Sequence, residues 1–186
     1  MDFDDFSENY KDVVEDSYVI SGLGHDFFTE IKTGFLKRVI SKKLGDQVEP
    51  RILDYGCGVG EFAGTLRGSF KKVEGVDVSE KSILIAQEKY PRYKFCTYDG
   101  ENLPYKDSSF DVIFTVNVMH HVDPEKWDSF LIEAKRVLRK GGFLIVFEHN
   151  PFNPLTLKTV RDCPLDADAN LLKAPFLKSK MEKVGY

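Results

Sequence analysis

Apolar residues near the start of the chain recur at helical spacing. Between residues 25 and 44 they fall on every third or fourth position, as one face of an amphipathic helix requires. The residue that follows, Gly45, suits a helix C-cap, because glycine adopts the left-handed backbone conformation without a steric penalty. We therefore predict one helix over 25–44 that ends at this glycine.

The pattern changes after residue 50, where short runs rich in Val, Ile and Leu alternate with helical stretches. Strands are expected at 51–55, 72–77, 93–97, 110–116 and 142–148, and helices at 60–67, 79–89 and 124–139. Ser79 and Asp123 suit the N-caps of the second and third of these helices. Apolar strands that alternate with helices are typical of a parallel sheet covered on both faces. The sequence thus predicts an α/β fold.

The first strand runs into the most informative segment of the chain, residues 51–62. Asp54 precedes three glycines at alternate positions, Gly56, Gly58 and Gly60, and a helix is expected after them. Such glycines let the backbone turn sharply and approach a ligand closely. A carboxylate beside them repels a bare phosphate and suits a ligand with a cationic or amine group. A nucleoside with a positively charged amino-acid tail, S-adenosylmethionine, meets this requirement.

A second acid, Asp77, ends the next expected strand, about 20 residues after the glycines. A carboxylate at this place can accept hydrogen bonds from both hydroxyls of a ribose. Nucleotide-dependent oxidoreductases share the arrangement, so Asp77 alone does not decide the ligand. Their glycine pattern requires glycine at position 61, where this chain carries Glu61. The oxidoreductase interpretation is disfavoured but stays open.

Four blocks, in order along the chain, carry a resemblance to a known family: residues 53–60, 76–79, 98–105 with 109–113, and 136–144. On these blocks the chain resembles the class I S-adenosylmethionine-dependent methyltransferases, in particular the group that acts on small molecules. The resemblance implies a Rossmann-like, doubly wound parallel sheet in the strand order 3-2-1-4-5. It also implies transfer of a methyl group from S-adenosylmethionine to an oxygen, nitrogen or carbon of a small molecule, with S-adenosylhomocysteine as product.

The resemblance further implies a set of cofactor-binding residues: Asp54, Gly56, Cys57, Gly58, Gly60, Asp77, Val78, Asp99, Gly100 and Asn117. Asp77 would hold the ribose and Val78 would pack on the adenine, whose amine Asp99 would bind. Asp54 would orient the glycine loop and the ammonium group of the cofactor, and Asn117 would face the methionine end. The simpler alternatives are turn roles for Asp54 and Asp99 and a helix cap for Asp77.

Three histidines are candidates for proton transfer: His120 and His121, after the fourth strand, and His149, after the fifth. Histidine titrates near neutral pH and can deprotonate an acceptor hydroxyl. His120 and His121 are equally open to a structural role, with the ring bonded to a backbone carbonyl. Methyl transfer from a sulfonium often needs no strong base, because alignment supplies much of the acceleration. Residues 148–154 are interpreted as a substrate-contacting segment, with a turn as the alternative.

We interpret residues 1–186 as a single methyltransferase domain. It would consist of an N-terminal arm and helix (1–45), which either packs on the domain or forms a lid, a cofactor-binding core (46–149) and a substrate-side segment (150–186). Members of the family usually end with an antiparallel hairpin, which is missing after the helix expected at 176–184. We therefore predict a truncated chain whose exposed sheet edge favours low solubility or a homodimer.

Composition narrows the remaining possibilities. The net charge of −4 and the lack of a basic stripe give no indication of nucleic-acid binding. No apolar run reaches the ~18 residues of a membrane span, and the acidic N-terminus does not resemble a signal peptide. The three scattered cysteines form neither a disulfide framework nor a zinc pattern, so we predict a cytoplasmic protein without a metal site. A cofactor-binding protein that no longer catalyses is the second alternative, and the acceptor cannot be read from the shared scaffold.

Overall fold

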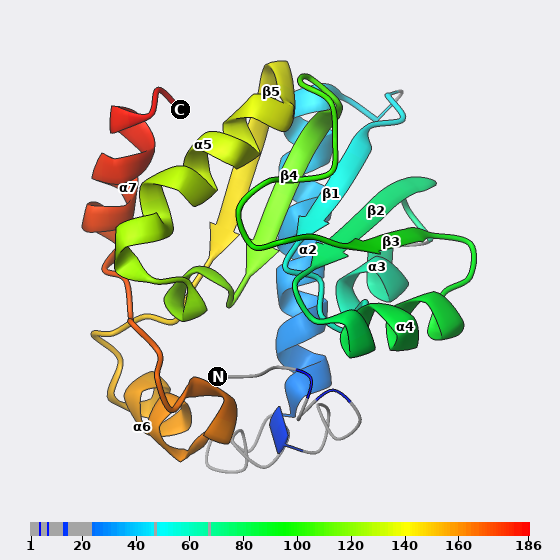
Figure 1. Ribbon diagram of the computed structural model, residues 1–186. Helices are drawn as coiled ribbons and strands as arrows, with labels where there is room; N and C mark the ends of the chain where they lie inside the picture. Colours follow the sequence, from blue (N-terminus) through cyan, green and yellow to red (C-terminus); the bar gives the residue numbers. More distant parts are fainter. Residues whose placement is uncertain (1–3, 5–6, 8–12, 15–23, 47, 67) are drawn as a thin grey trace.

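The computed structural model describes residues 4, 7, 13–14, 24–46, 48–66 and 68–186. Within them, five strands form one parallel sheet: β1 (Arg51–Tyr55), β2 (Lys72–Asp77), β3 (Lys94–Thr97), β4 (Phe110–Val116) and β5 (Leu138–Phe147). The strand order β3-β2-β1-β4-β5 confirms the predicted doubly wound α/β fold (Figure 1). Most of the N-terminal arm, including the predicted lid, lies outside the described residues.

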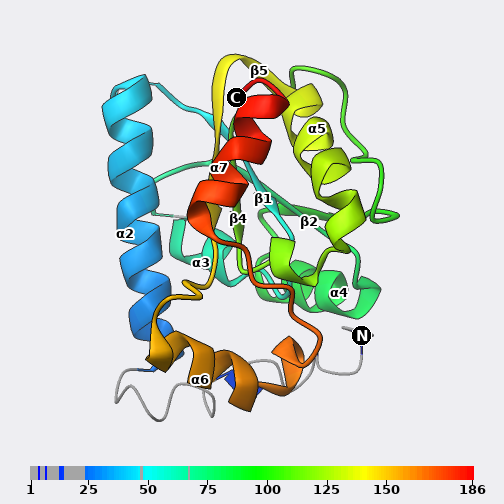
Figure 2. The same cartoon turned by 90° about the vertical axis from the view of Figure 1, so that its left-hand side faces the viewer.

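Helices cover both faces of the sheet (Figure 1). One face carries α2 (His25–Leu44), α3 (Glu61–Leu66) and α4 (Glu80–Lys89), and the other carries α5 (Trp127–Val137) and α7 (Ala174–Lys183). In Figure 2, α6 (Pro154–Asp162) lies below the lower end of the sheet, beside the start of α2. The strands end on this same side, so α6 lies next to the carboxyl ends of the strands.

Neighbouring residues of a strand pack into opposite layers. In β1, Ile52 packs with α2, α3 and α4, whereas Leu53 packs with α5 and α7. In β4, Ile113 and Phe114 repeat this division, and all four side chains are fully buried. Because both faces are covered, these strands appear in the sequence as continuous apolar runs. That is why the predicted bounds of β1 and β4 match those of the structure. The bounds of β2 match as well, although this strand mixes charged and apolar residues.

Helix α2 spans 20 residues and ends as the sequence predicts. Gly45 has a φ of 81°, and its backbone N–H donates to the carbonyl of Ser41 at 2.8 Å. The buried residues of α2 include Leu36 and Ile40, which are part of the core. Among the described residues, no helix has both the length and the apolar content needed to cross a membrane.

The boundary between α5 and β5 differs from the sequence prediction. The sequence predicts a helix to residue 139 and a strand from 142, whereas α5 ends at Val137 and β5 starts directly after it. Leu138 pairs with Phe110 beside an irregular register and packs in the core under α5. Burial of this leucine therefore starts the strand four residues early. Asp123 caps a short 3-10 helix over Pro124–Lys126 that leads into α5, rather than α5 itself.

A further helix occupies the segment that the sequence leaves as a loop. The side chain of Asn153 accepts a hydrogen bond from the backbone N–H of Leu155 at 2.9 Å, and Pro154 takes the first position of α6. An Asn-Pro pair thus starts a helix here, as an N-cap followed by proline can. Residues 148–186 contain no strand, so β5 is an edge strand and α7 is the last element.

Candidate active site

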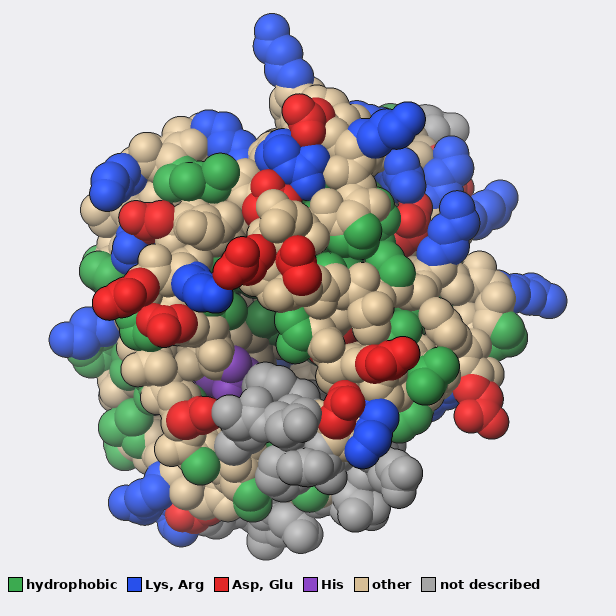
Figure 3. Space-filling model, viewed as in Figure 1, with side chains coloured by type: hydrophobic (Ala, Val, Ile, Leu, Met, Phe, Trp, Pro, Cys, Tyr) green, Lys and Arg blue, Asp and Glu red, His purple; other side chains and the backbone are tan. Residues whose placement is uncertain are grey.

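A cavity of about 450 Å³ opens at the carboxyl ends of the strands. Its lining includes residues that follow β1, β2, β4 and β5, together with residues from the start of α2 and from α6. Figure 3 shows histidine surface within a hollow on this face of the molecule. In an open parallel sheet, ligands bind beyond the carboxyl ends of the strands, where the connections of neighbouring strands diverge. The cavity is therefore the candidate active site.

The glycine loop after β1 forms one wall of the cavity. Gly56, Gly58 and Gly60 all have positive φ angles, of 83°, 50° and 79°. A Cβ at Gly56 would collide with the side chain of Val118, which belongs to the loop after β4. Gly56 and Gly58 line the cavity with Cys57, whereas Gly60 packs closely against Ala86 and Phe95. The first two glycines let a ligand approach the backbone closely, and the third allows close packing at the start of α3.

Asp77 lies at the tip of β2 and lines the cavity. One carboxylate oxygen accepts the backbone N–H of Gly58 at 2.8 Å, and the other accepts that of Ser79 at 2.9 Å. Burial raises the pKa of Asp77, and these N–H donors partly offset the effect. Each oxygen keeps a lone pair for a further donor. Ser79 itself caps α4 through the N–H of Ser82, so the helix cap does not depend on Asp77.

Asp54 is buried beneath the glycine loop, with 2% of its surface exposed, and does not line the cavity. Its Oδ2 atom has no hydrogen-bond partner among the described residues. Burial raises the pKa of Asp54 well above its usual range, and the nearby Asp77 carboxylate raises it further. A buried acceptor without a partner is costly, and it is relieved when a cation or donor comes near. The local charge therefore fits a ligand with an ammonium or sulfonium group.

The other predicted cofactor residues divide into two groups. Val78, Gly100 and Asn117 line the cavity, and Val78 leaves an apolar side chain 47% exposed there. Asn117 has a φ of 56°, a conformation that asparagine tolerates better than most residues. Asp99 is exposed outside the lining, and its Oδ1 accepts the backbone N–H groups of Glu101 and Asn102 at 2.8 and 2.6 Å. The turn role accounts for the position of Asp99, and contact with adenine stays a prediction.

The three candidate histidines meet at one carboxylate, that of Asp166, at the end of the 3-10 helix η5 (Pro164–Asp166). The Nε2 atom of His120 lies 3.2 Å from Asp166 Oδ1, and that of His121 lies 3.4 Å from the same oxygen. His149 Nε2 lies 3.6 Å from Asp166 Oδ2. We call these four residues the histidine cluster. His121, His149 and Asp166 line the cavity, whereas His120 is completely buried behind them.

Glu148 holds His120 in place from the other side of the ring. Its Oε2 atom lies 2.6 Å from His120 Nδ1. Its Oε1 atom accepts the backbone N–H groups of Val118 and Met119 at 3.2 and 2.8 Å. The carboxylate thus joins the end of β5 to the loop after β4 and fixes the orientation of the imidazole.

The three histidines differ in charge. Burial lowers the pKa of His120, but its hydrogen bonds to Asp166 and Glu148 outweigh this effect and raise the pKa to about 9. Burial and the neighbouring charge of His120 lower the pKa of His121 to about 4, and the same two causes lower that of His149 to about 4. In the metal-free protein, the two rings at the cavity are therefore neutral near pH 7, while the buried ring is a cation.

Sequence reasoning selected the histidines but not their carboxylate partners, Glu148 and Asp166. Both lie in segments flagged as polar, yet nothing in their spacing from position 120 indicates a contact. A further pair is also new: His25, at the start of α2, bonds to Glu61, at the start of α3, and both line the cavity. These contacts depend on how distant loops converge.

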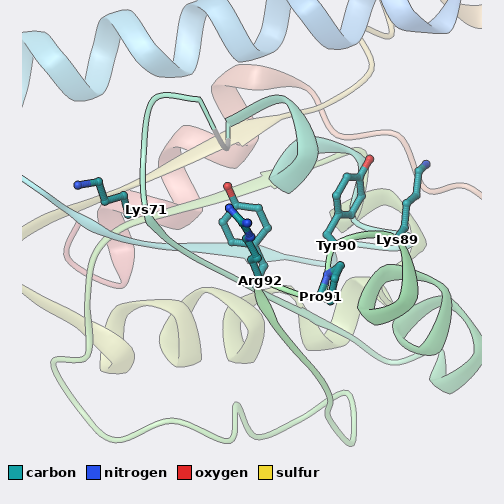
Figure 4. A pocket seen from close by; sticks show the side chains of 6 residues that line it. Lys71, Lys89, Tyr90, Pro91 and Arg92 are labelled. Carbon is teal, nitrogen blue, oxygen red and sulfur yellow. The ribbon is translucent and has the colours of Figure 1, made fainter.

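A second cavity, of about 440 Å³, lies away from these residues (Figure 4). It is lined by Lys71, Lys89, Tyr90, Pro91, Arg92 and Tyr93. Lys71 precedes β2 and Tyr93 precedes β3, so the cavity lies at the amino ends of the strands. None of the predicted site residues lines it. In a parallel sheet of this topology, ligands bind at the carboxyl ends of the strands, which is the opposite end.

A known family matches the core of this fold. The family described as "Methyltransferase domain" matches residues 53–146, half of the chain, and this stretch runs from the glycine loop to the end of β5. The chain belongs to the class I S-adenosylmethionine-dependent methyltransferases. The match covers the glycine loop, Asp77 and His120, and the structure adds Glu148 and Asp166, which follow it along the chain.

Individual relatives of this chain support the family assignment. It is 33% identical over 133 residues to the demethylmenaquinone methyltransferase of Tropheryma whipplei, covering 67% of this chain and 55% of that protein. It is 38% identical over 119 residues to the 27-O-demethylrifamycin SV methyltransferase of Amycolatopsis mediterranei, covering 60% and 42%. An S-adenosylmethionine-dependent methyltransferase structure from Thermotoga maritima superimposes with a TM-score of 0.68 at 26% identity, covering 98% and 79%. The chain spans about half the length of the curated relatives it matches.

Proposed function

We propose that this chain transfers a methyl group from S-adenosylmethionine to a small-molecule acceptor. The observation that carries the proposal is the wall formed by Asp77 and the glycine loop, in which a carboxylate bonded to Gly58 faces the cavity above the buried acid Asp54. A ribose diol fits the carboxylate of Asp77, and a positively charged cofactor would offset the burial of Asp54, whose Oδ2 atom has no partner among the described residues. Family membership supports the same cofactor.

The cavity residues support one orientation of the cofactor. With the ribose at Asp77, the adenine would lie along Val78 and Gly100, which line the cavity next to it. The methionine end would then lie along Gly56 and Asn117, at the ends of β1 and β4. The bound cofactor supplies an activated methyl group on sulfur, and the protein aligns it with the acceptor.

The acceptor would lie between the methionine end and the histidine cluster. His121, His149 and Asp166 give that part of the cavity its polar atoms, and a neutral imidazole can accept a proton from an acceptor hydroxyl. His149 is the base candidate because its ring is neutral and lines the cavity. His120 and Glu148 position the cluster and would not touch the substrate.

A small acceptor is favoured by the relatives, whose names specify demethylmenaquinone and a rifamycin. The acceptor itself, and whether an O, N or C atom is methylated, depend on loops that differ between proteins of one fold. The alternative of a cofactor-binding protein without turnover predicts binding of both sulfur nucleosides and no product with any acceptor. A cytoplasmic location and a homodimer likewise stay predictions.

Titration calorimetry tests the cofactor assignment. S-Adenosylmethionine and S-adenosylhomocysteine should bind wild-type protein, and Asp77→Ala should weaken both by roughly 10–100-fold, as expected for hydrogen bonds to a charged group. Asp107→Ala is the matched control, because Asp107 is an exposed acid that pairs with Arg136 and does not line the cavity. Binding of NAD by the wild type, or equal affinity of Asp77→Ala and the control, would contradict the proposal.

A further inference from the structure

Three of the four histidines in the chain point their Nε2 atoms at the carboxylate of Asp166. They come from two loops, and the carboxylate comes from a third segment. The contacts of His121 and His149 with Asp166, at 3.4 and 3.6 Å, are longer than normal N–H···O hydrogen bonds. Hydrogen bonding alone therefore accounts poorly for this convergence.

The spacing fits a shared metal ion. Two ligand atoms at tetrahedral positions around an ion, each at about 2.0–2.1 Å, lie roughly 3.3–3.4 Å apart. The Nε2 atoms of His120 and His121 lie 3.2 and 3.4 Å from the same oxygen, Oδ1 of Asp166, close to this value. Ligand atoms of His120, His121 and Asp166 all lie within 4.8 Å of one another. His149 lies outside this group, but its Nε2 atom is 3.6 Å from the second carboxylate oxygen of Asp166, which makes it the candidate for a fourth ligand.

The surroundings of His120 match those of a metal-bound histidine. A ligating imidazole commonly donates its second N–H to a carboxylate, which fixes the tautomer and the ring orientation. Here Glu148 takes the Nδ1 side of His120 at 2.6 Å, which leaves Nε2 directed at the cluster. Glu148 is in turn held by two backbone N–H groups. The carboxylates of Glu148 and Asp166 outnumber the one charged ring, His120, and a bound divalent cation would take over the role of its proton in balancing them.

We propose that the histidine cluster binds a divalent transition-metal ion. Three imidazoles and one carboxylate suit zinc, iron, cobalt, nickel or manganese, and they disfavour calcium and magnesium, which prefer oxygen ligands. Because three of the four ligands line the cavity, the ion has an open side toward it. The sequence predicts no metal site, because its cysteines form no zinc pattern. The proposal revises that prediction, because the ligands are residues 120, 121, 149 and 166 rather than cysteines.

The role of the ion in catalysis rests on the proposed function. A hydroxyl or carboxylate oxygen of the acceptor would occupy the open position beside the methionine end of the cofactor. Coordination would lower the pKa of a bound hydroxyl, so that it could release its proton to water, and its oxygen would then attack the methyl group as S-adenosylhomocysteine leaves. His149 then acts as a ligand rather than as a base.

Cobalt(II) titration of chelator-treated, full-length protein tests the proposal through visible absorption, which reports the coordination of the ion. One cobalt ion per chain should bind, and zinc should displace it. Asp166→Asn and His149→Ala should each weaken cobalt binding by roughly 100-fold or more, beyond the 10–100-fold typical of outer-shell changes. His25→Gln is the matched control, because His25 lines the same cavity outside the cluster and bonds to Glu61; its affinity for cobalt should stay unchanged.

Two results would overturn the proposal: no saturable cobalt absorption in the wild type, or equal cobalt affinity in the cluster variants and His25→Gln. Circular dichroism of each variant shows whether it folds, and thermal denaturation with and without zinc gives a second readout on the wild type. S-Adenosylhomocysteine titration of the same samples separates the two hypotheses. If S-adenosylhomocysteine binds and cobalt does not, the metal site alone is contradicted. If cobalt binds and S-adenosylhomocysteine does not, the proposed function is contradicted.

Discussion

The two halves of the cavity are built in different ways. The cofactor half comes from short strand–turn segments, in which Asp54 and Gly56, or Asp77 and Ser79, are close in sequence and in space. The acceptor half comes from residues up to 46 positions apart, as in the contact of His120 with Asp166. The first half is built from glycines and acids at strand ends, which the sequence shows directly, whereas the second half depends on how distant loops converge on one carboxylate. Substitutions in the two halves should therefore have different effects.

The largest effect on stability is expected in the acceptor half, from His120→Ala. The change leaves the buried carboxylates of Glu148 and Asp166 without their shared partner, and breaking a buried ion pair typically costs about 3–5 kcal/mol. Urea unfolding measures the free energy of unfolding. His121→Ala, which removes a ring that lines the cavity, should cost clearly less. Similar losses for both variants would show that the Glu148–His120 contact is not the centre of the cluster.

Gly56→Ala should give the next largest effect on stability, and it should abolish cofactor binding. The new Cβ collides with Val118 and the position has a φ of 83°, so both the loop and the cavity wall must move. Gly141→Ala is a matched control, because Gly141 has the same φ of 83° with no atom within 4 Å of the added Cβ. The control should lose about 1–2 kcal/mol from backbone strain alone and bind cofactor normally. Equal losses in the two variants would mean that strain, not the close approach, matters at Gly56.

Asp54→Asn should stabilise the cofactor-free protein while weakening cofactor binding. The folded-state pKa of Asp54 is raised by burial and by Asp77, so its favourable contribution is complete below the usual carboxyl pKa and is lost as pH rises through the folded value. The asparagine variant lacks this loss, so its advantage in free energy of unfolding should grow with pH and reach roughly 1–2 kcal/mol. Urea unfolding between pH 4 and 8 measures the difference. A difference independent of pH would contradict the burial of an ionisable Asp54.

The smallest effect is expected at Asp99. Its carboxylate already accepts N–H groups of Glu101 and Asn102 in an exposed turn, so Asp99→Ala should change cofactor affinity less than about threefold. Calorimetry beside Asp77→Ala gives the comparison. A tenfold loss at Asp99 would support the contact with adenine that the family resemblance implies.

The same contrast explains how much could be predicted. The bounds of β1 and β4 follow from apolar runs buried on both faces, and the cofactor residues follow from glycines and acids at strand ends. The start of β5 was wrong because burial of Leu138 outweighs the helical pattern around it. Helix α6 was missed because it spans only nine residues and begins at an Asn-Pro pair, which also favours turns.

The histidines illustrate the same limit within the site. Residue type singled out all three as candidates, but their roles depend on partners that spacing does not reveal. His120 proved completely buried, and its two carboxylate partners lie 28 and 46 positions further along the chain. Convergence of loops on one carboxylate is a property of the fold, so it became visible only in three dimensions.

A crystal structure of the protein with S-adenosylhomocysteine and zinc tests the central claim most directly, namely that the two halves form one active site. The account predicts ribose hydroxyls on the carboxylate of Asp77, the homocysteine sulfur directed toward the histidine cluster, and anomalous density for zinc between the ring nitrogens and Asp166. A nucleoside bound away from Asp77, or with its sulfur directed away from the cluster, would contradict it.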